Sequence, residues 1–443
     1  MDEARIIRTY MTLAGLYTLA ASLIWSVNTL FLLDAGLGIG EVFVANAAFS
    51  AGMVLFEIPT GVVADTIGRR ASYLMSVTVL AATTALYLIA AQAEAGVVVF
   101  VVVSIAMGLG FTFYSGALEA WLVDALKARG RDGALDQVFA RGQQISGVAM
   151  FSGTIAGGFL GQLDLAVPFI ARSVLLVAVF VIAARLMVEI GFTPAPLTLG
   201  EVPARMREQA TVGISSGWGQ PGLRRLMIAG LVRGSFMGWA FYAAQPYLLE
   251  LLERDAVWVI GLVTAGVSLG TIVGNQLVSV WSRRCSRRST MLLAASAATA
   301  GAGVLMGLTS SFAITAGALM IIAVSMGVIM PVRQAYLHQV TASEHRATVV
   351  SFDAMVTSVG GVGGQVGLGA ISDARSFGTG YVVGGAFTVL ALPVLVSLRR
   401  LGEAADRLGP GAEAGADSTC PSGLPRNTAV EAHPVDVLAG DER

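Results

Sequence analysis

Twelve long apolar segments follow one another along this chain of 443 residues, and they constrain its fold more than any other feature. Each is close to the ~20 residues that a helix needs to cross ~30 Å of hydrocarbon. Hydrophobic residues make up 55% of the sequence and charged residues only 13%, which is too apolar for a soluble domain of this length. Open β-strands are excluded because their unpaired backbone groups cannot face lipid. The sequence therefore predicts an all-α membrane protein with twelve transmembrane helices. The predicted spans are 10–33, 42–64, 72–92, 96–122, 142–163, 166–187, 223–249, 257–281, 291–309, 312–337, 348–371 and 381–398.

The distribution of Lys and Arg predicts the orientation of these spans. The connections after even-numbered spans are rich in basic residues, whereas the alternate connections carry mainly Asp and Glu. Basic residues accumulate on the cytoplasmic side of membrane proteins. We therefore expect a multi-pass protein of the cell membrane with both termini in the cytoplasm. The basic residues are Arg69, Arg70, Lys127, Arg129, Arg131, Arg141, Arg205, Arg207, Arg224, Arg225, Arg283, Arg284, Arg287, Arg288 and Arg346.

The longest internal connection lies at the middle of the chain and divides the spans into two sets of six. The halves resemble each other: Ala120-Trp121-Leu122 is repeated as Ala335-Tyr336-Leu337. Paired halves of this kind are typical of transporters built from two pseudo-symmetric bundles. After Arg400 the sequence has little to bury, which predicts a disordered tail. The expected organisation is a cytoplasmic N-terminus (1–9), a first six-helix bundle (10–187), a central cytoplasmic loop (188–222), a second bundle (223–398) and a disordered cytoplasmic tail (399–443).

A short polar motif separates the second predicted span from the third. Gly61 removes a side chain where two helices would touch, and Gly68 permits the turn that follows. Asp65 ends the apolar segment, and Arg69 and Arg70 favour the cytoplasmic side. The pattern G-x-x-x-D-x-x-G-R-R resembles the loop signature of the major facilitator superfamily. Members of that family often have Arg after the Asp, where this chain has Thr66.

The resemblance implies two six-helix bundles that rock around a central site near the middle of the membrane. It also implies that the motif belongs to a latch on the cytoplasmic side, together with Asp124 and Arg141. The run Gly153-Thr154-Ile155-Ala156-Gly157-Gly158 resembles part of a signature of bacterial drug/proton antiporters in the same family, with Thr154 replacing a Pro. The glycines also suit close helix packing alone.

Two carboxylates inside or near the spans are candidates for proton coupling, since ionisable groups are expensive there. Glu57 shares a helix face with Gly61 and Asp65. It either carries a proton or makes a fixed hydrogen bond within the interface. Glu119 lies near the inner end of the fourth span and either pairs with Arg141 or faces the cavity.

Three arginines also fall within predicted spans. Arg233 lies ~15 Å along the seventh span, near the middle of the membrane, where it meets either an anionic substrate or a protein carboxylate. Arg333, in the tenth span, and Asp353, in the eleventh, are expected to be gate or interface residues. Arg172 is near the outer end of its span and is expected to extend its charge to the membrane surface.

Aromatic, amide and methionine side chains on four spans predict the lining of the central cavity. In the resembled family these spans face the substrate, and large aromatics with flexible Met suit bulky apolar solutes. Packing and contact with lipid are the simpler roles for any one of these side chains. The candidate residues are Trp25, Asn28, Tyr114, Arg233, Trp239, Tyr242, Gln245, Met330 and Arg333.

Other chemistries find no support in the sequence. The three histidines lack metal-ligand spacing, and no Gly-rich loop with Lys is present to bind phosphates. The two cysteines, Cys285 and Cys420, fall in predicted cytosolic segments, which does not favour a disulfide. We therefore expect no enzyme activity, no cofactor, no metal and no nucleic-acid partner.

These features predict a secondary active transporter that acts as a monomer in the lipid bilayer. The preferred function is proton-coupled efflux of a small amphiphilic compound. An uptake symporter or uniporter for a polar or anionic molecule is the alternative, and a membrane scaffold or receptor without transport activity is the third.

Overall fold

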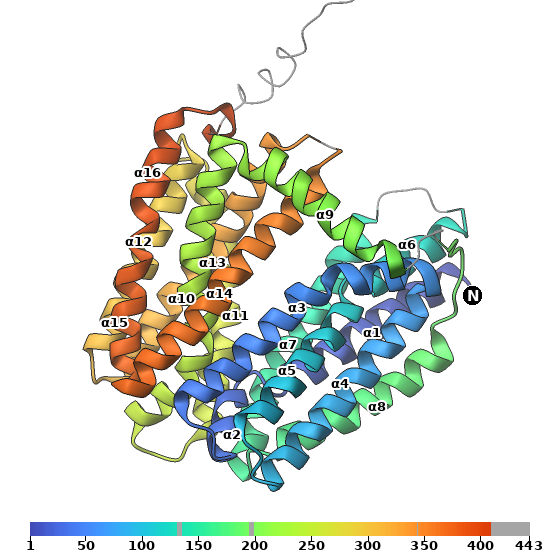
Figure 1. Cartoon of the computed structure of the whole chain (residues 1–443), viewed down its shortest axis with the longest axis horizontal. Coiled ribbons are helices and arrows are strands. Elements are labelled where there is room, and N and C mark those ends of the chain that lie inside the picture. The colour runs from blue at the N-terminus through green and yellow to red at the C-terminus, as the bar shows by residue number, and fades with distance from the viewer. Residues whose placement is uncertain (131–134, 195–198, 343, 409–443) are drawn as a thin grey trace, which may run out of the picture. The chain divides into compact units, whose positions relative to one another are not determined.

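The computed structural model describes residues 1–130, 135–194, 199–342 and 344–408, and this part of the chain is almost entirely helical (Figure 1). No β-strand occurs there, only an isolated bridge between Arg287 and Arg407. Ten helical stretches are long and apolar enough to cross a membrane. Two further spans are α1 with α2, which is interrupted, and α7, whose first turns are polar. The predicted all-α fold with twelve transmembrane helices is confirmed.

The first bundle contains α1 to α8, and its core extends through the whole bundle from Ile6 to Met187. Buried aromatic rings form much of this core: Phe31 contacts Phe169, and their ring centroids are 4.1 Å apart. The helices are α1 (Glu3–Ser22), α2 (Asn28–Asp34), α3 (Ile39–Ile67), α4 (Arg69–Gln92), α5 (Val97–Tyr114), α6 (Ala117–Lys127), α7 (Asp136–Leu163) and α8 (Val167–Leu186).

The second bundle contains α10 to α16 and has two buried clusters, one toward each end. The helices are α10 (Pro221–Leu252), α11 (Val257–Trp281), α12 (Arg288–Leu308), α13 (Phe312–Val340), α14 (Arg346–Ala374), α15 (Phe377–Thr388) and α16 (Ala391–Leu401).

Three spans that the sequence predicts as continuous are interrupted in the structure. The first breaks at 23–27, between α1 and α2, and the fourth breaks at 115–116, between α5 and α6. Gly116 has a φ of 75°, a left-handed conformation that glycine adopts without strain. This backbone conformation prevents α5 from continuing into α6. The last span breaks at 389–390. Breaks inside a membrane are tolerated only where protein or a water-filled cavity satisfies the freed backbone groups, and apolar composition does not reveal such sites.

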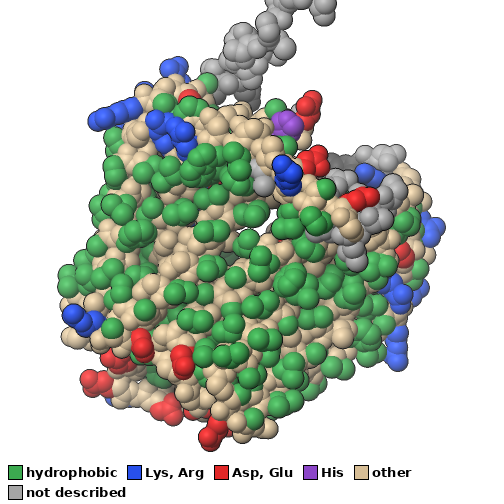
Figure 2. All heavy atoms as spheres, in the orientation of Figure 1, with side chains coloured by type: hydrophobic (Ala, Val, Ile, Leu, Met, Phe, Trp, Pro, Cys, Tyr) green, Lys and Arg blue, Asp and Glu red, His purple; other side chains and the backbone are tan. Residues whose placement is uncertain are grey.

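The two ends of the bundles differ in charge. In Figure 2 most Lys and Arg lie along the upper and right-hand margins, together with some Asp and Glu, whereas Asp and Glu predominate at the bottom. We call the first the basic end, where the turn 67–70 and the segment 282–287 lie. We call the second the acidic end, where the connections 34–38, 93–96, 164–166 and 253–256 lie.

The bundles contact each other along three helix pairs, mainly α3 with α14 and α7 with α11, and also α2 with α10. The two backbones approach closely at Gly158 and Gly261, where a Cβ on Gly158 would lie 2.7 Å from Gly261 Cα. Beside it, Phe159 stacks on Trp258 with ring centroids 5.9 Å apart. Small residues allow membrane helices to pack this closely. Phe43 of α3 joins the second bundle's core, with its ring 5.8 Å from that of Trp239.

Three glutamines make all the hydrogen bonds between the bundles in the described part of the chain. Gln245 of α10 bonds to the interrupted first span. Gln365 of α14 donates to Ser50 Oγ at 3.4 Å and to Gly238 O of its own bundle at 3.1 Å. Gln162 of α7 donates to Asp255 O at 3.1 Å. The bundles are therefore joined by neutral amides and by close packing.

The central connection and the start of the tail contain more structure than expected. The connection includes η1 (Leu199–Glu201), α9 (Val202–Val212) and η2 (Gly213–Trp218), and α9 contacts both α3 and α14. Beyond α16, Asp406 accepts hydrogen bonds from Ser289 N and Oγ at 2.7 and 2.8 Å. The predicted disordered tail is therefore wrong for residues 399–408, which include the end of α16 and η3 (Ala404–Asp406). Its remainder, 409–443, lies outside the described residues.

We expect Gly158→Val to lower the free energy of unfolding by about 1–3 kcal/mol, because the added side chain would overlap Gly261. Gly147→Val on the same helix is the control, since a Cβ there meets nothing within 4 Å. Thermal unfolding of the purified proteins in detergent provides the measurement. Equal stability of the two variants would mean that α7 and α11 are not in contact.

Candidate functional site

A cavity of about 290 Å³ lies among the helices of the first bundle and is closed on one side by α10. Its walls are mainly aromatic and aliphatic, and Arg172 is their only charged residue. Small-molecule sites are typically concave and largely apolar, with few polar groups and volumes of about 300–1,000 Å³. This volume suits a small compound. The lining residues are Ala21, Ile24, Trp25, Asn28, Asn46, Phe49, Met53, Tyr87, Met107, Phe111, Arg172, Phe241 and Tyr242.

The break in the first span positions one wall of this cavity. Gln245 Nε2 donates to Trp25 O at 2.8 Å, and Gln245 Oε1 accepts from Thr29 N at 2.8 Å. One amide thus satisfies a backbone carbonyl within the break and a backbone N–H just after it. Gln245 is only 1% exposed, so it supports the wall from behind instead of facing the cavity. Trp25 and Asn28, on the break and the following helix, do line the cavity.

Arg172 of α8 is 5% exposed and lines the cavity, so the expectation that it reaches the membrane surface is wrong. Its Nε is buried without a hydrogen-bond partner. No described residue forms an ion pair with it, and the groups that act on it electrostatically are the phenols of Tyr17 and Tyr87. Its position near the start of α8 suggested access to the surface, but the surrounding helices cover it.

Two further polar residues of the cavity were not predicted from the sequence. Asn46 Oδ1 accepts from Asn28 Nδ2 at 3.0 Å, which leaves the buried Asn46 Nδ2 without a partner. Tyr87 forms a hydrogen bond with Ser104 Oγ at 2.5 Å. Asn46 stands between two alanines in the apolar sequence of α3. A polar residue in such a run is the only feature of the sequence that could have identified it.

A second hollow, a cleft of about 500 Å³, lies between α3 and α14 on the basic side of the cavity. Glu57 lines it, is exposed and accepts a hydrogen bond from Ser115 Oγ at 3.3 Å. Gly61 and Asp65 line the same cleft. Met53, one turn before Glu57, lines both the cleft and the cavity, so the two spaces are adjacent.

Gly61 was predicted to lie where two helices touch, but a Cβ on it would meet nothing within 4 Å. The reason is that α3 and α14 are separated at this level by the cleft. Figure 2 shows a gap between the bundles on this side of the molecule.

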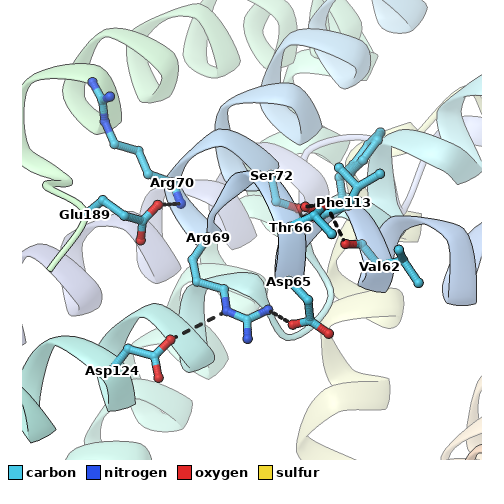
Figure 3. A network of polar contacts seen from close by, with 10 residues as sticks. Val62, Asp65, Thr66, Arg69, Arg70, Ser72, Phe113, Asp124 and Glu189 are labelled. Carbon is cyan, nitrogen blue, oxygen red and sulfur yellow. Dashed lines mark hydrogen bonds and ion pairs between the residues drawn. The ribbon is translucent and has the colours of Figure 1, made fainter. Parts of the chain in front are cut away.

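The motif residues form a polar network within the first bundle (Figure 3). Arg69 NH1 lies 2.5 Å from Asp65 Oδ1, and its Nε lies 3.6 Å from Asp124 Oδ2. Arg69 also stands over the ring of Phe192, 5.9 Å from its centroid. One guanidinium thus connects the end of α3 with α6 and with the segment after α8.

The neighbouring Arg70 connects the same turn to the end of α8. Its backbone N–H donates to Glu189 Oε2 at 2.9 Å (Figure 3). Its NH2 donates to Ala184 O at 2.8 Å. Gly68 has a φ of 111°, and a Cβ there would lie 2.6 Å from Glu189 Oε2. Glycine is therefore required both by the backbone and by the approach of Glu189, which sequence reasoning did not identify.

Arg141 and Glu119 lie apart from this network. Both are exposed, and no ion pair or hydrogen bond joins either of them to another described residue. The pair of Glu119 with Arg141, one of the two alternatives for Glu119, is absent from the described residues, and Arg141 does not join Asp124 there. Glu119 instead lies close enough to Tyr10 and Tyr114 to act on their phenols electrostatically.

Three charged residues meet inside the second bundle. Arg333 NH2 lies 2.5 Å from Asp353 Oδ1, and both terminal nitrogens donate to Thr357 Oγ1 at 3.1 Å. Arg233 is 8% exposed and interacts electrostatically with both Arg333 and Asp353. Among the described residues only Arg333 forms an ion pair with Asp353, and Arg233 adds a second positive charge nearby.

The other predicted cavity residues are placed as follows. Tyr242 lines the cavity. Tyr114 stacks on Tyr17 within the first bundle with ring centroids 3.6 Å apart. Trp239 is fully buried against Phe43 and Tyr381, and Met330 is 40% exposed. These three are not among the residues that line the cavity or the cleft.

Comparisons with known proteins agree with this architecture. A family model described as Major Facilitator Superfamily matches residues 10–258 and 256–429. No curated protein matches the chain. Similar solved structures include the nucleoside transporter NupG, with a TM-score of 0.74, 10% identity and coverage of 90% of this chain and 100% of that one.

Two other solved structures of transporters are also similar to this chain. One is a POT family transporter in complex with thioalcohol conjugated peptide, with a TM-score of 0.68, 11% identity and coverage of 89% and 96% of the two chains. The other is the human organic anion transporter MFSD10 (TETRAN), with a TM-score of 0.58, 15% identity and coverage of 89% and 100%. At these identities the likeness shows the fold alone.

We expect Asp353→Asn to reduce stability more than Arg333→Gln. Removing one partner of a buried ion pair costs about 3–5 kcal/mol, but after loss of Arg333 the carboxylate still has Arg233. Loss of Asp353 leaves two buried guanidiniums without a carboxylate. Unfolding of purified proteins measures both changes.

The control is Arg346→Gln, which removes an exposed arginine from the same helix as Asp353 and should change stability by less than about 0.5 kcal/mol. The reverse order would mean that Arg233 does not interact with Asp353.

Proposed function

Because the chain belongs to the Major Facilitator Superfamily, we propose that it is a secondary active transporter that exports a small amphiphilic compound in exchange for protons. The observation that carries the proposal is the asymmetry of the two hollows. A mainly apolar cavity in the first bundle, closed on one side by α10, adjoins a cleft between α3 and α14 that lies toward the basic end. We place the basic end in the cytoplasm, as the distribution of Lys and Arg predicts.

Alternating access follows if the bundles rock so that the cleft closes and the acidic end opens. Gly61 supports this step, since its missing side chain has no role while the cleft is open but permits α14 to approach α3. The hydrogen bonds of the three glutamines would break as the acidic end opens. The Asp65, Arg69 and Asp124 network would keep the turn between α3 and α4 rigid during this motion.

Glu57 is our candidate for proton coupling. It faces the cleft, and the residues of α14 that line the other side are Ser351, Ala354, Met355 and Ser358, none of which is basic. Closing the cleft would bury an ionised carboxylate without a cation, which is costly, so the closed state favours the protonated form. Opening the cleft would release that proton to the cytoplasm. Met53 brings this site next to the substrate cavity.

The cavity supports a substrate that is largely apolar with a small polar part. Nucleosides, peptides and organic anions appear in the names of similar structures, so the shared fold does not select a compound. An uptake symporter or uniporter for an anionic molecule is the second candidate. The positive charge of Arg172 in the cavity favours this function over that of a membrane scaffold, which needs no charged binding site.

The test is proton movement in everted, energised membrane vesicles as lipophilic cations, antibiotics, sugars and organic anions are added. For a transported compound we expect release of protons from the acidified lumen. Glu57→Gln should abolish this release because the amide cannot carry a proton. Glu94→Gln, in an exposed connection at the acidic end, should leave it unchanged.

Other outcomes would contradict the proposal in specific ways. Proton movement in the same direction as the substrate would indicate symport, and substrate flux without proton movement would indicate a uniporter. Loss of coupling in Glu119→Gln but not in Glu57→Gln would assign the proton to Glu119.

A further inference from the structure

We propose that the substrate is a small organic anion whose carboxylate binds Arg172 and Asn46 while its apolar body lies among the aromatic rings of the cavity. This inference rests on the proposed function, since it names the substrate class of the same site. It depends on three observations: the charge of the cavity, its unused donors and the cost of leaving Arg172 unpaired.

The cavity carries a net positive charge. Among its thirteen lining residues Arg172 is the only charged one. In the second bundle, by contrast, Arg333 is paired with Asp353 at 2.5 Å, and Arg233 lies near the same carboxylate. Arg172 has no such partner among the described residues, although it is just as deeply buried.

Two buried donors lack acceptors in this one cavity. They are Arg172 Nε, on α8, and Asn46 Nδ2, on α3. Buried donors are nearly always satisfied in folded proteins, so unsatisfied ones require an explanation. An anion with two oxygens supplies acceptors for both and cancels the charge. A neutral or cationic substrate would leave the guanidinium uncompensated.

The rest of the cavity indicates the body of the substrate. Trp25, Phe49, Phe111, Phe241 and Tyr242 present apolar or aromatic surface on several sides. Such walls suit a flat, apolar group and offer few partners for the many hydroxyls of a sugar. The volume of about 290 Å³ restricts the anion to a small one.

The test compares three probes of similar size: 1-naphthylacetate, 1-naphthylacetamide and 1-naphthylmethylammonium. Their binding to the purified full-length protein in detergent is measured by isothermal titration calorimetry. We expect the carboxylate to bind about ten- to a hundredfold more tightly than the amide, as for a hydrogen-bonded charge pair. The ammonium probe should bind most weakly.

Arg172→Gln should abolish the preference for the carboxylate, and Arg172→Lys should retain part of it. Arg185→Gln is the matched control because it removes an exposed arginine from the end of the same helix. Thermal unfolding checks that each variant is folded. It also gives an independent readout: Arg172→Gln should be at least as stable as the parent, because it removes an uncompensated buried charge.

The inference would be overturned if the parent protein bound the carboxylate and the amide equally, or failed to bind the carboxylate. It would also be overturned if folded Arg172→Gln kept the preference. These results are separate from the vesicle experiment. A carboxylate preference without proton movement would refute proton exchange and leave the site assignment intact, whereas proton exchange driven only by cations would refute the site assignment and leave the transporter intact.

Discussion

One buried amide supports both the cavity and the junction of the two bundles. A break in a membrane helix frees backbone groups that lipid cannot satisfy. In the first span, Gln245 supplies both partners by donating to Trp25 O and accepting from Thr29 N. Because Gln245 belongs to the second bundle, repairing the break also joins the bundles. Trp25 and Asn28 owe their positions in the cavity wall to this contact, and the placement of the candidate substrate site depends on it.

The number of membrane-spanning helices and the family could be predicted because they depend on the composition of successive segments, which can be read directly from the sequence. Twelve apolar segments, the alternation of basic and acidic connections and the motif from Gly61 to Arg70 were sufficient for the fold and the family. The interruptions could not be predicted. The segment from Tyr10 to Leu33 contains no charged residue, and its break depends on a glutamine more than two hundred residues away. Local composition carries no trace of such a partner.

The site was harder to predict than the fold because burial depends on neighbouring helices. Arg172 and Arg233 are both arginines in apolar runs, but distance from a helix end was a poor guide to their surroundings. Arg172 is covered by the first bundle and faces the cavity, whereas Arg233 lies beside Arg333 and Asp353. Likewise Trp239 and Tyr242 are three residues apart on α10, but one fills a core and the other lines the cavity.

The chemical difference between the two ends of the molecule has a consequence for its response to the medium. At the acidic end the bundles are joined by neutral amides and by glycine contacts, which dissolved ions hardly affect. At the basic end the turn between α3 and α4 is stabilised by partly exposed charges on Arg69, Asp65 and Asp124, within the reach of screening by salt over ~8 Å at physiological ionic strength. Ionic strength would therefore act on the turn between α3 and α4 and hardly on the junction of the bundles at the other end, so the firmness of that turn would depend on the salt on one side of the molecule.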